Sequence, residues 1–317
     1  MTQEKVGISI IVPVFNEAEV LPEFHSRIMP VLESLEESFE LLFVDDGSRD
    51  GSVEIVSEFA DTDHRIGLLA LSRNFGKEIA MTAGMDHVSG DAVVIIDADL
   101  QDPPELIPEL VNNWRAGYDN VFAQRSAREG ESALKRGSAH LFYRMINRLS
   151  EVPIPKDTGD YRLLSRRAVE DLNQLREQHR FMKGLFAWVG HRQKAVHYRR
   201  EPRYAGQSKW DYWRLWNFAL EGITSFSTAP LKLATYLGIT TAFGAFCYAV
   251  IIIQKTLRYG NPVDGWSSLM VVMLFLGGVQ LLTLGIVGEY VGRTFDETKN
   301  RPLYIVGRHL PTRRERG

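Results

Sequence analysis

Two long stretches without a charged residue constrain this chain more than any other feature. Leu233–Ile253 spans 21 residues and Trp266–Gly288 spans 23, and neither contains Asp, Glu, Lys or Arg. A helix of about 20 apolar residues crosses the hydrocarbon core of a bilayer, which is about 30 Å thick. The sequence therefore predicts two transmembrane helices, at about 231–255 and 266–290, within a membrane segment at 230–293.

Basic residues flank these stretches unequally. The link between them, Gln254–Gly265, holds only Lys255, Arg258 and Asp264, whereas the segment after the second stretch is rich in arginine. Because positively charged loops stay on the cytoplasmic side, both termini are predicted to be cytoplasmic and the link external. The first residues lack the pattern of a signal peptide. We therefore expect a multi-pass protein of the plasma membrane with a cytoplasmic domain at 1–207 and a basic cytoplasmic tail at 294–317.

The formal net charge of -3 conceals a segregation of charge along the chain. Residues 1–123 hold 7 Lys and Arg against 24 Asp and Glu, whereas residues 124–210 hold 19 against 9. Such a basic stretch suits nucleic acid or anionic lipid, or forms a solvated surface of mixed charge. The single cysteine, Cys247, excludes an intrachain disulfide. The sequence contains no H-E-x-x-H, P-loop or G-x-G-x-x-G motif, which argues against zinc hydrolases, ATPases and Rossmann dehydrogenases.

The first 125 residues alternate between short apolar runs and helical patterns. Strands are predicted at Gly7–Phe15, Glu40–Val44, Ile66–Leu71 and Ala92–Ile96, with helical patterns between them. This order predicts an α/β fold, a mainly parallel sheet with helices on both faces. Further along, the aromatic residues of Trp210–Phe226 indicate an amphipathic helix at the membrane surface, within a juxtamembrane segment at 208–229.

Acidic pairs follow two of the predicted strands. Asp45 and Asp46 end the second strand, and Asp97 and Asp99 follow the apolar run AVVII. Ligands bind beyond the carboxyl ends of strands in such sheets. Two carboxylates separated by one residue can both approach one hard cation such as Mg²⁺ or Mn²⁺, although acidic turns are also common.

Several motifs in fixed order resemble those of family 2 glycosyltransferases with a GT-A-type fold. The first four are IIVPVFNE (10–17), VDDGSRDGS (44–52), RNFGKE (73–78) and DADLQDPPE (97–105). The match extends through DTGDYRLLSR, RYAGQSKW, NFALEGITSFS and NRPLYIV, and so covers nearly the whole chain. More closely, the chain resembles the polyprenyl-phosphate glycosyltransferases, first those that act on bactoprenol (the GtrB type), and then the dolichyl-phosphate mannose synthases.

The resemblance implies a nucleotide pocket and a metal site. Asp46 would hydrogen-bond the uracil or its ribose, or else would hold an Asx turn. Asp97 would contact the ribose or the metal's water shell, Asp99 would ligate Mg²⁺ or Mn²⁺, and Gln101 would assist at the metal or the diphosphate. The metal would neutralise the departing diphosphate. The other residues implied at the nucleotide are Pro13, Val14, Asn16, Glu17 and Lys77.

Asp160 is the first candidate for the catalytic carboxylate, and Asp157 is the second. The implied acceptor is a phosphate monoester with a second pKa of about 6, so it is largely dianionic at pH 7. Such a nucleophile hardly needs a general base, and Asp160 would instead orient the acceptor or stabilise the oxocarbenium-like sugar. Capping of a loop is the alternative role for both carboxylates.

The acceptor phosphate requires cations close to the membrane. Arginine offers bidentate hydrogen bonds to phosphate, and lysine offers a point charge. Attraction to anionic lipid without specificity is the alternative role for such residues. The candidates are Arg125, Lys135, Arg136, Arg203, Ser208 and Lys209.

The implied activity is inverting transfer of glucose from UDP-glucose to the phosphate of undecaprenyl phosphate at the cytoplasmic face of a bacterial membrane. UDP-4-formamido-arabinose and GDP-mannose stay open as donors, and a membrane scaffold is the non-enzyme alternative. A processive polysaccharide synthase would carry more spans and a QxxRW motif, which this sequence lacks. The implied partners are the lipid bilayer and further copies of the chain, which form a tetramer by resemblance. No nucleic-acid partner is implied.

Overall fold

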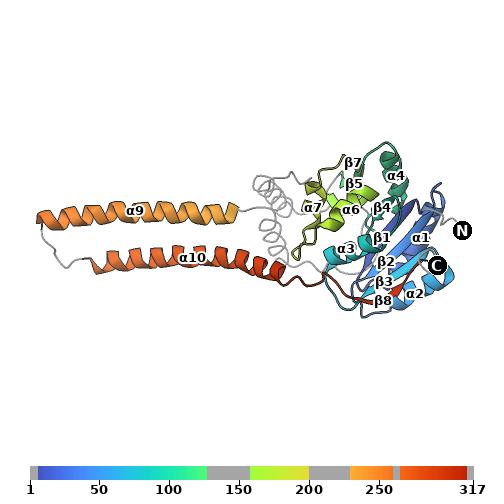
Figure 1. Cartoon of the computed structure of the whole chain (residues 1–317), viewed down its shortest axis with the longest axis horizontal. Helices are drawn as coiled ribbons and strands as arrows, with labels where there is room; N and C mark the ends of the chain where they lie inside the picture. Colours follow the sequence, from blue (N-terminus) through green and yellow to red (C-terminus); the bar gives the residue numbers. More distant parts are fainter. Residues whose placement is uncertain (1–5, 127–157, 200–228, 260–264, 313–317) are drawn as a thin grey trace. The chain divides into compact units, whose positions relative to one another are not determined.

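The computed structural model describes residues 6–126, 158–199, 229–259 and 265–312 (Figure 1). The chain divides into two compact units. One contains a β-sheet, and the other contains two long helices. Residues from Arg301 onward belong again to the unit with the sheet, so the helical unit is an insertion within it.

The sheet has eight strands among the described residues, in the order β7-β5-β6-β4-β1-β2-β3-β8. Strands β1 to β4 run parallel to one another, whereas β6 is antiparallel to both β4 and β5, and β8 is antiparallel to β3. The predicted mainly parallel α/β sheet is therefore confirmed. The strands are β1 (Ile8–Val14), β2 (Phe39–Asp45), β3 (Ile66–Leu71), β4 (Ala92–Ile95), β5 (Asn120–Arg125), β6 (Thr158–Ser165), β7 (Gln193–Tyr198) and β8 (Val306–Leu310).

Helices cover both faces of this sheet, as predicted. The order of the strands reverses direction after β3, so right-handed crossovers place α1 and α2 on one face and α3 on the other. The packing of α4 on α1 and of α6 on α3 extends both layers. The helices of this unit are α1 (Leu21–Glu33), α2 (Ser52–Thr62), α3 (Lys77–His87), η1 (Pro104–Leu106), α4 (Ile107–Arg115), α6 (Arg166–Gln174) and α7 (Met182–Trp188).

Close packing of α3 on β1 sets the position of the helix that carries Lys77. Residues Ile79–Met85 of α3 are all buried. A Cβ added at Gly84 would lie 2.5 Å from Cγ2 of Ile11, well inside van der Waals contact. Glycine at this position therefore lets α3 approach the sheet more closely than any larger residue would allow.

Two strands differ from the sequence interpretation. The segment 294–317 was interpreted as a basic tail, but Val306–Leu310 forms β8 at the edge of the sheet. The sequence predicts no strand at Thr158–Ser165, but this segment forms β6 inside the sheet. Neither shows a clear strand pattern because β8 lies at an exposed edge, where polar residues are tolerated, and β6 contains the charged Asp160 and Arg162.

The helical unit contains α9 (Ala229–Tyr259) and α10 (Trp266–Thr298). Both helices are longer than the predicted spans. Within the described residues, Pro230–Tyr259 and Phe275–Thr298 are long and apolar enough to cross a membrane, with mean hydropathies of 1.9 and 1.3. The most apolar stretch of each helix is not buried by other described residues, whereas the core helix of a soluble protein is mostly buried. The predicted amphipathic helix, Trp210–Phe226, lies outside the described residues.

Candidate active site

The carboxyl ends of the parallel strands bring the acidic motifs to one edge of the sheet. Val14 of β1 is in register with Asp45 of β2, and Ile11 of β1 with Ile95 of β4. Because β6 runs antiparallel to β4 and pairs Arg162 with Ile95, the first residues of β6 reach the same edge. The site edge is therefore built from loops after four strands and from the beginning of a fifth.

Lys77 bridges two carboxylates at this edge. Its Nζ lies 2.7 Å from Oδ1 of Asp97 and 2.6 Å from Oδ2 of Asp160. The three side chains come from the start of α3, the turn after β4 and the start of β6, and they are 41%, 26% and 12% exposed respectively. The structure thus brings together three residues that the sequence assigned separately to diphosphate, metal or ribose, and catalysis.

The charges of this cluster shift its pKa values in different directions. Burial disfavours the ammonium of Lys77, but Asp160 and Asp97 outweigh burial and raise the pKa of Lys77. Burial also opposes ionisation of Asp160, yet Lys77 and then Lys183 hold its pKa below the ordinary value. For Asp97, burial and the neighbouring carboxylates prevail over Lys77 and raise the pKa. Asp160 is therefore a carboxylate at neutral pH, which suits charge stabilisation better than proton abstraction.

Glu78 is a further acidic residue beside this cluster that the sequence interpretation did not select. Its Oε2 accepts a hydrogen bond of 2.9 Å from the backbone N–H of Met182, where α7 begins. Burial, followed by repulsion from Asp160, raises the pKa of Glu78 to about 7. Lys77 and Lys183 act in the opposite direction. The sequence could have indicated Glu78 as a site residue only through its position directly after Lys77 in the motif RNFGKE.

Replacing Glu78 by glutamine is expected to stabilise the protein above pH 7 and to leave it unchanged near pH 5. The folded-state pKa lies above the unfolded value of 4.5, so wild-type stability falls as pH rises from about 4.5 to about 7. Glutamine keeps an oxygen for the Met182 N–H and removes the buried charge, which corresponds to up to about 3 kcal/mol at pH 8. Thermal unfolding of the detergent-solubilised protein at pH 5 and pH 8 measures this difference.

The matched control for this measurement is Glu109→Gln, which changes an exposed glutamate on α4. It should shift the melting temperature equally, and little, at both pH values. An identical effect of Glu78→Gln at pH 5 and pH 8 would contradict the burial of an ionised Glu78.

Asp46 positions the loop that precedes α3. Its Oδ1 accepts a hydrogen bond of 2.7 Å from the N–H of Phe75, and its Oδ2 one of 2.9 Å from the N–H of Gly76. Burial nevertheless raises the pKa of Asp46. The Asx turn considered for Asp46 is made by its neighbour Asp45, whose Oδ2 accepts from the N–H groups of Gly47 and Ser48 at 3.0 and 3.1 Å.

Gly47 allows this loop to lie close to the turn after β2. Its φ is +74°, in the left-handed region that favours glycine. A Cβ there would lie 2.6 Å from the backbone of Arg73 and Asn74. The loop 73–76 is therefore held by both Gly47 and Asp46, directly before the helix that begins at Lys77.

The loop after β1 is joined to the loop before α2. Asn16 has a φ of +53°, its N–H donates to Oγ of Ser48 at 2.9 Å, and its Oδ1 accepts from the N–H of Arg49 at 2.8 Å. The N–H of Glu17 donates to Oγ of Ser52 at 3.1 Å. Pro13 and Val14, the other predicted nucleotide residues of this region, are the last two residues of β1 and lie at the same edge.

Asp97 and Asp99 offer the oxygen ligands that a hard divalent cation requires. Asp99 is 8% exposed, and its Oδ1 accepts a hydrogen bond of 3.1 Å from the backbone N–H of Gln101. Leu100, between Asp99 and Gln101, has a φ of +58°, so the turn after β4 is tight. The described residues contain no group of three or more His, Cys, Asp or Glu that could hold a metal ion by themselves. Asp97 and Asp99 are the residues at this edge whose chemistry fits such a cation.

Arg125, a predicted acceptor-phosphate ligand, ends β5 at the same edge, where it pairs in register with Tyr198. A hydrogen bond joins their side chains, and the Tyr198 hydroxyl also donates to Asp102. Arg162 lies deeper, with its guanidinium 3.7 Å from the centre of the Phe186 ring, and burial lowers its pKa to about 10. The other candidates for the acceptor and catalysis lie outside the described residues: Lys135, Arg136, Asp157, Arg203, Ser208 and Lys209.

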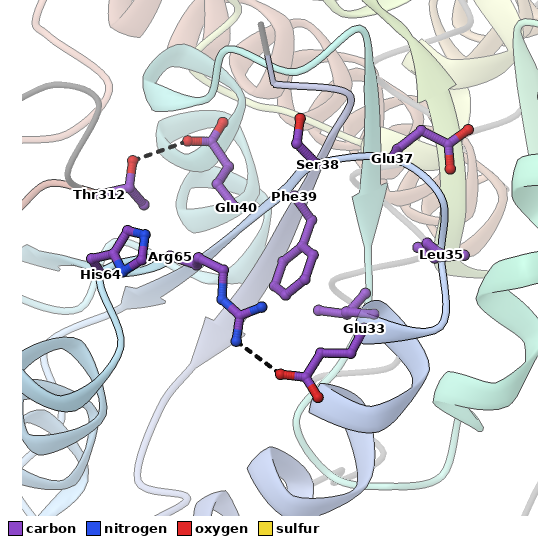
Figure 2. A pocket seen from close by; sticks show the side chains of 10 residues that line it. Glu33, Leu35, Glu37, Ser38, Phe39, Glu40, His64, Arg65 and Thr312 are labelled. Atoms are coloured by element: carbon purple, nitrogen blue, oxygen red, sulfur yellow. Dashed lines mark hydrogen bonds and ion pairs between the residues drawn. The ribbon is translucent and has the colours of Figure 1, made fainter. Parts of the chain in front are cut away.

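A separate cavity of about 360 Å³ opens at the amino ends of β2 and β3, the opposite edge of the sheet (Figure 2). Glu40 is buried there and accepts hydrogen bonds from the hydroxyls of Ser9 and Thr312 at 2.6 and 3.2 Å. Arg65, also in its lining, already pairs with Glu33 at 2.9 Å. None of the predicted site residues lines this cavity.

Comparison with known proteins gives consistent matches. Residues 9–172 match the model of "Glycosyl transferase family 2", and residues 229–294 match that of the "GtrB C-terminal hairpin". An uncharacterized glycosyltransferase of Synechocystis is 51% identical over 95% of both chains. The SfII prophage-derived bactoprenol glucosyl transferase of Shigella flexneri is 49% identical over 94% of this chain and 97% of that one. A solved glucosyl-3-phosphoglycerate synthase from Mycobacterium tuberculosis is 20% identical, with a TM-score of 0.47 over 69% of this chain and 76% of that one.

Proposed function

Because the chain belongs to glycosyl transferase family 2, we propose that it transfers glucose from UDP-glucose to the phosphate of undecaprenyl phosphate. The observation that carries the proposal is the cluster of Asp97, Lys77 and Asp160 at the carboxyl edge of the sheet, in a chain that also has two apolar helices. The names of the bactoprenol glucosyl transferases that resemble it support this choice of sugar and lipid.

The donor binds at the loops after β1, β2 and β4. The loops 15–18 and 46–52, joined through Asn16 and Ser48, form one wall for the nucleoside. Asp46 contributes to nucleotide binding by holding the loop 73–76 in place, in addition to a direct contact with the nucleotide. Lys77 then stands at the diphosphate, where its ammonium offsets the negative charge of the leaving group.

Asp97 and Asp99 would hold a divalent cation, Mg²⁺ or Mn²⁺, with the N–H of Gln101 orienting Asp99. The bound cation supplies Lewis-acid stabilisation of the departing UDP. Lys77, whose Nζ lies 2.7 Å from Oδ1 of Asp97, would offer its ammonium to the same diphosphate. Asp160 keeps its charge throughout, because Lys77 and Lys183 both lower its pKa.

An oxygen of the acceptor phosphate attacks C1 of glucose on the side opposite to UDP. The bond from C1 to the UDP oxygen breaks, its electron pair leaves with UDP, and the configuration at C1 inverts. The attacking phosphate is largely dianionic at pH 7, so no proton has to be removed from it. Asp160 stabilises the positive charge that develops on the sugar, and Arg125 lies at the same edge for the acceptor phosphate.

A transfer assay on purified protein in detergent tests this function. It supplies undecaprenyl phosphate with radiolabelled UDP-glucose, UDP-galactose, GDP-mannose or UDP-4-formamido-arabinose, with Mn²⁺ or with EDTA. The expected result is label in the lipid phase from UDP-glucose alone, lost with EDTA. If the lipid were labelled from another donor, that donor's sugar would replace glucose in the proposed reaction. If no donor labelled the lipid although the protein still bound UDP, the polyprenyl-phosphate acceptor would be refuted.

A further inference from the structure

The loop between β4 and η1 carries Asp99, one of the two carboxylates assigned to the cation. We call residues 99–103 the cation loop. The N–H of Gln101 donates a hydrogen bond of 3.1 Å to Oδ1 of Asp99, so the direction of this carboxylate depends on the position of the backbone at Gln101. Asp102 and Pro103 follow directly. Contacts that fix these two residues therefore also fix the backbone that orients Asp99.

Two buried tyrosines of the sheet hold the end of the cation loop. The hydroxyl of Tyr161, in β6, donates a hydrogen bond of 2.9 Å to the carbonyl of Pro103, and that of Tyr198, in β7, donates one to Oδ1 of Asp102. Asp102 itself is 2% exposed. The two rings meet edge to face, with centroids 6.3 Å apart, and both belong to the hydrophobic core. The loop is therefore attached to strands of the sheet, which are more rigid than another loop would be.

The hydrogen bonds at Tyr198 run in one direction only. Its side chain is also hydrogen-bonded to Arg125, the residue with which it pairs in register. A guanidinium only donates, a carboxylate only accepts, and a hydroxyl has one proton. The proton of Tyr198 therefore goes to Asp102, and its oxygen accepts from Arg125. Burial, and then the charge of Asp102, raises the pKa of both tyrosine hydroxyls, so Tyr161 and Tyr198 remain donors at neutral pH.

We propose that Asp102, Tyr161 and Tyr198 are positioning residues for the divalent cation: they hold the cation loop so that Asp99 presents its carboxylate to the ion. The inference rests on the proposed function, because it requires the cation that the function assigns to Asp97 and Asp99. The three residues act through the loop and are not themselves ligands. Partners that orient the ligands of a metal without binding it typically change its affinity by about 10–100-fold when they are replaced.

The double variant Tyr161→Phe, Tyr198→Phe tests the proposal, since it removes both hydroxyls and keeps both rings. Mn²⁺ binding to the purified full-length protein, saturated with UDP, is measured by electron paramagnetic resonance from the loss of the free Mn²⁺ signal. We expect the dissociation constant for Mn²⁺ to rise at least about tenfold. The affinity for UDP in EDTA, measured by calorimetry, should not change, because the nucleoside wall is built from the loops 15–18 and 46–52.

Replacement of Asp102 separates positioning from direct binding of the ion. The amide oxygen of Asp102→Asn still accepts from the hydroxyl of Tyr198, so this variant should keep most of the wild-type affinity for Mn²⁺. Asp102→Ala has no acceptor and should lose about as much affinity as the double variant, at least about tenfold. If asparagine cost as much affinity as alanine, the charge of Asp102 would act on the ion directly, and the positioning role would be overturned.

The matched control is Tyr304→Phe, which also removes a tyrosine hydroxyl that donates to an aspartate, here Oδ2 of Asp86 at 2.8 Å in the last turn of α3. It should lower the melting temperature and leave the affinity for Mn²⁺ unchanged. A weaker affinity in this control, or equal affinities of wild type and the double variant, would overturn the inference alone. If wild type with UDP bound no Mn²⁺, the cation chemistry of the proposed function would fail as well, so the two failures are distinguishable.

Discussion

Replacing Asp160 by asparagine is expected to lower kcat for sugar transfer by about 10²–10³-fold, the usual cost of removing one group that stabilises transition-state charge. Asparagine has nearly the same shape but carries no charge, so the developing positive charge on the sugar would lose the carboxylate that we propose stabilises it. The ion pair of Asp160 with Lys77, at 2.6 Å, is lost as well. Single-turnover transfer measures the effect, with UDP affinity as a check that the donor site is intact.

The pH profile gives this prediction a second test. The pKa of Asp160 lies below its ordinary value because Lys77 and Lys183 oppose its burial. Asp160 therefore stays ionised through the range above pH 5, and wild-type kcat should show no acidic limb from it there. Asp171→Asn, on the exposed side of α6, is the matched control and should retain full activity. An Asp160→Asn enzyme of near wild-type rate would remove Asp160 from the reaction.

The second large effect is expected for Asp99→Asn. The amide oxygen can still accept from the N–H of Gln101, so the turn after β4 is preserved, but a neutral ligand binds a hard cation more weakly. Transfer should fall at least about a hundredfold at limiting Mn²⁺, because Lewis-acid stabilisation of the leaving group is worth several kcal/mol. The measurement is the Mn²⁺ dependence of transfer, together with the affinity for UDP in the presence and absence of Mn²⁺.

The metal-free measurement separates a ligand from a structural residue. If Asp99 binds the cation, wild type in EDTA and Asp99→Asn should have the same UDP affinity, and added Mn²⁺ should improve only the wild type. Equal improvement of both proteins would place the cation elsewhere. A loss of thermal stability without any change in Mn²⁺ dependence would mean that Asp99 acts through the turn alone.

The strands and helices of the first 125 residues were predictable because their patterns are local. The predicted strands at Gly7–Phe15, Glu40–Val44 and Ile66–Leu71 are the buried strands β1, β2 and β3, and the helical pattern after the third of them is α3. The position of Asp97 and Asp99 also followed, since all carboxyl ends in a parallel array share one edge. The two apolar helices were predictable from length and charge alone.

The strands β6 and β8 could not be predicted in the same way. Their segments combine charged and apolar residues, and what makes them strands is pairing with β4, β5 and β3. The side-chain contact of Lys77 with Asp160 spans 83 positions of sequence, and that of Glu78 with Met182 spans 104. No local sequence pattern predicts contacts between residues so far apart in the chain, because these contacts depend on the order of the strands in the sheet.

The sequence by itself therefore determined most of the secondary structure of the first 125 residues, the family, the two long apolar helices and the acidic residues that follow strands at the carboxyl edge of the sheet. Hydrophobic periodicity, turn chemistry and motif order are properties of neighbouring residues, and they survive without a fold. Only the tertiary structure decided that Lys77 lies between Asp97 and Asp160 and that Asp46 holds the loop 73–76. It also decided that the C-terminal segment adds strand β8 to the edge of the sheet. Those facts arise from non-local pairing, in which residues far apart in the chain share one edge of a sheet or one end of a helix.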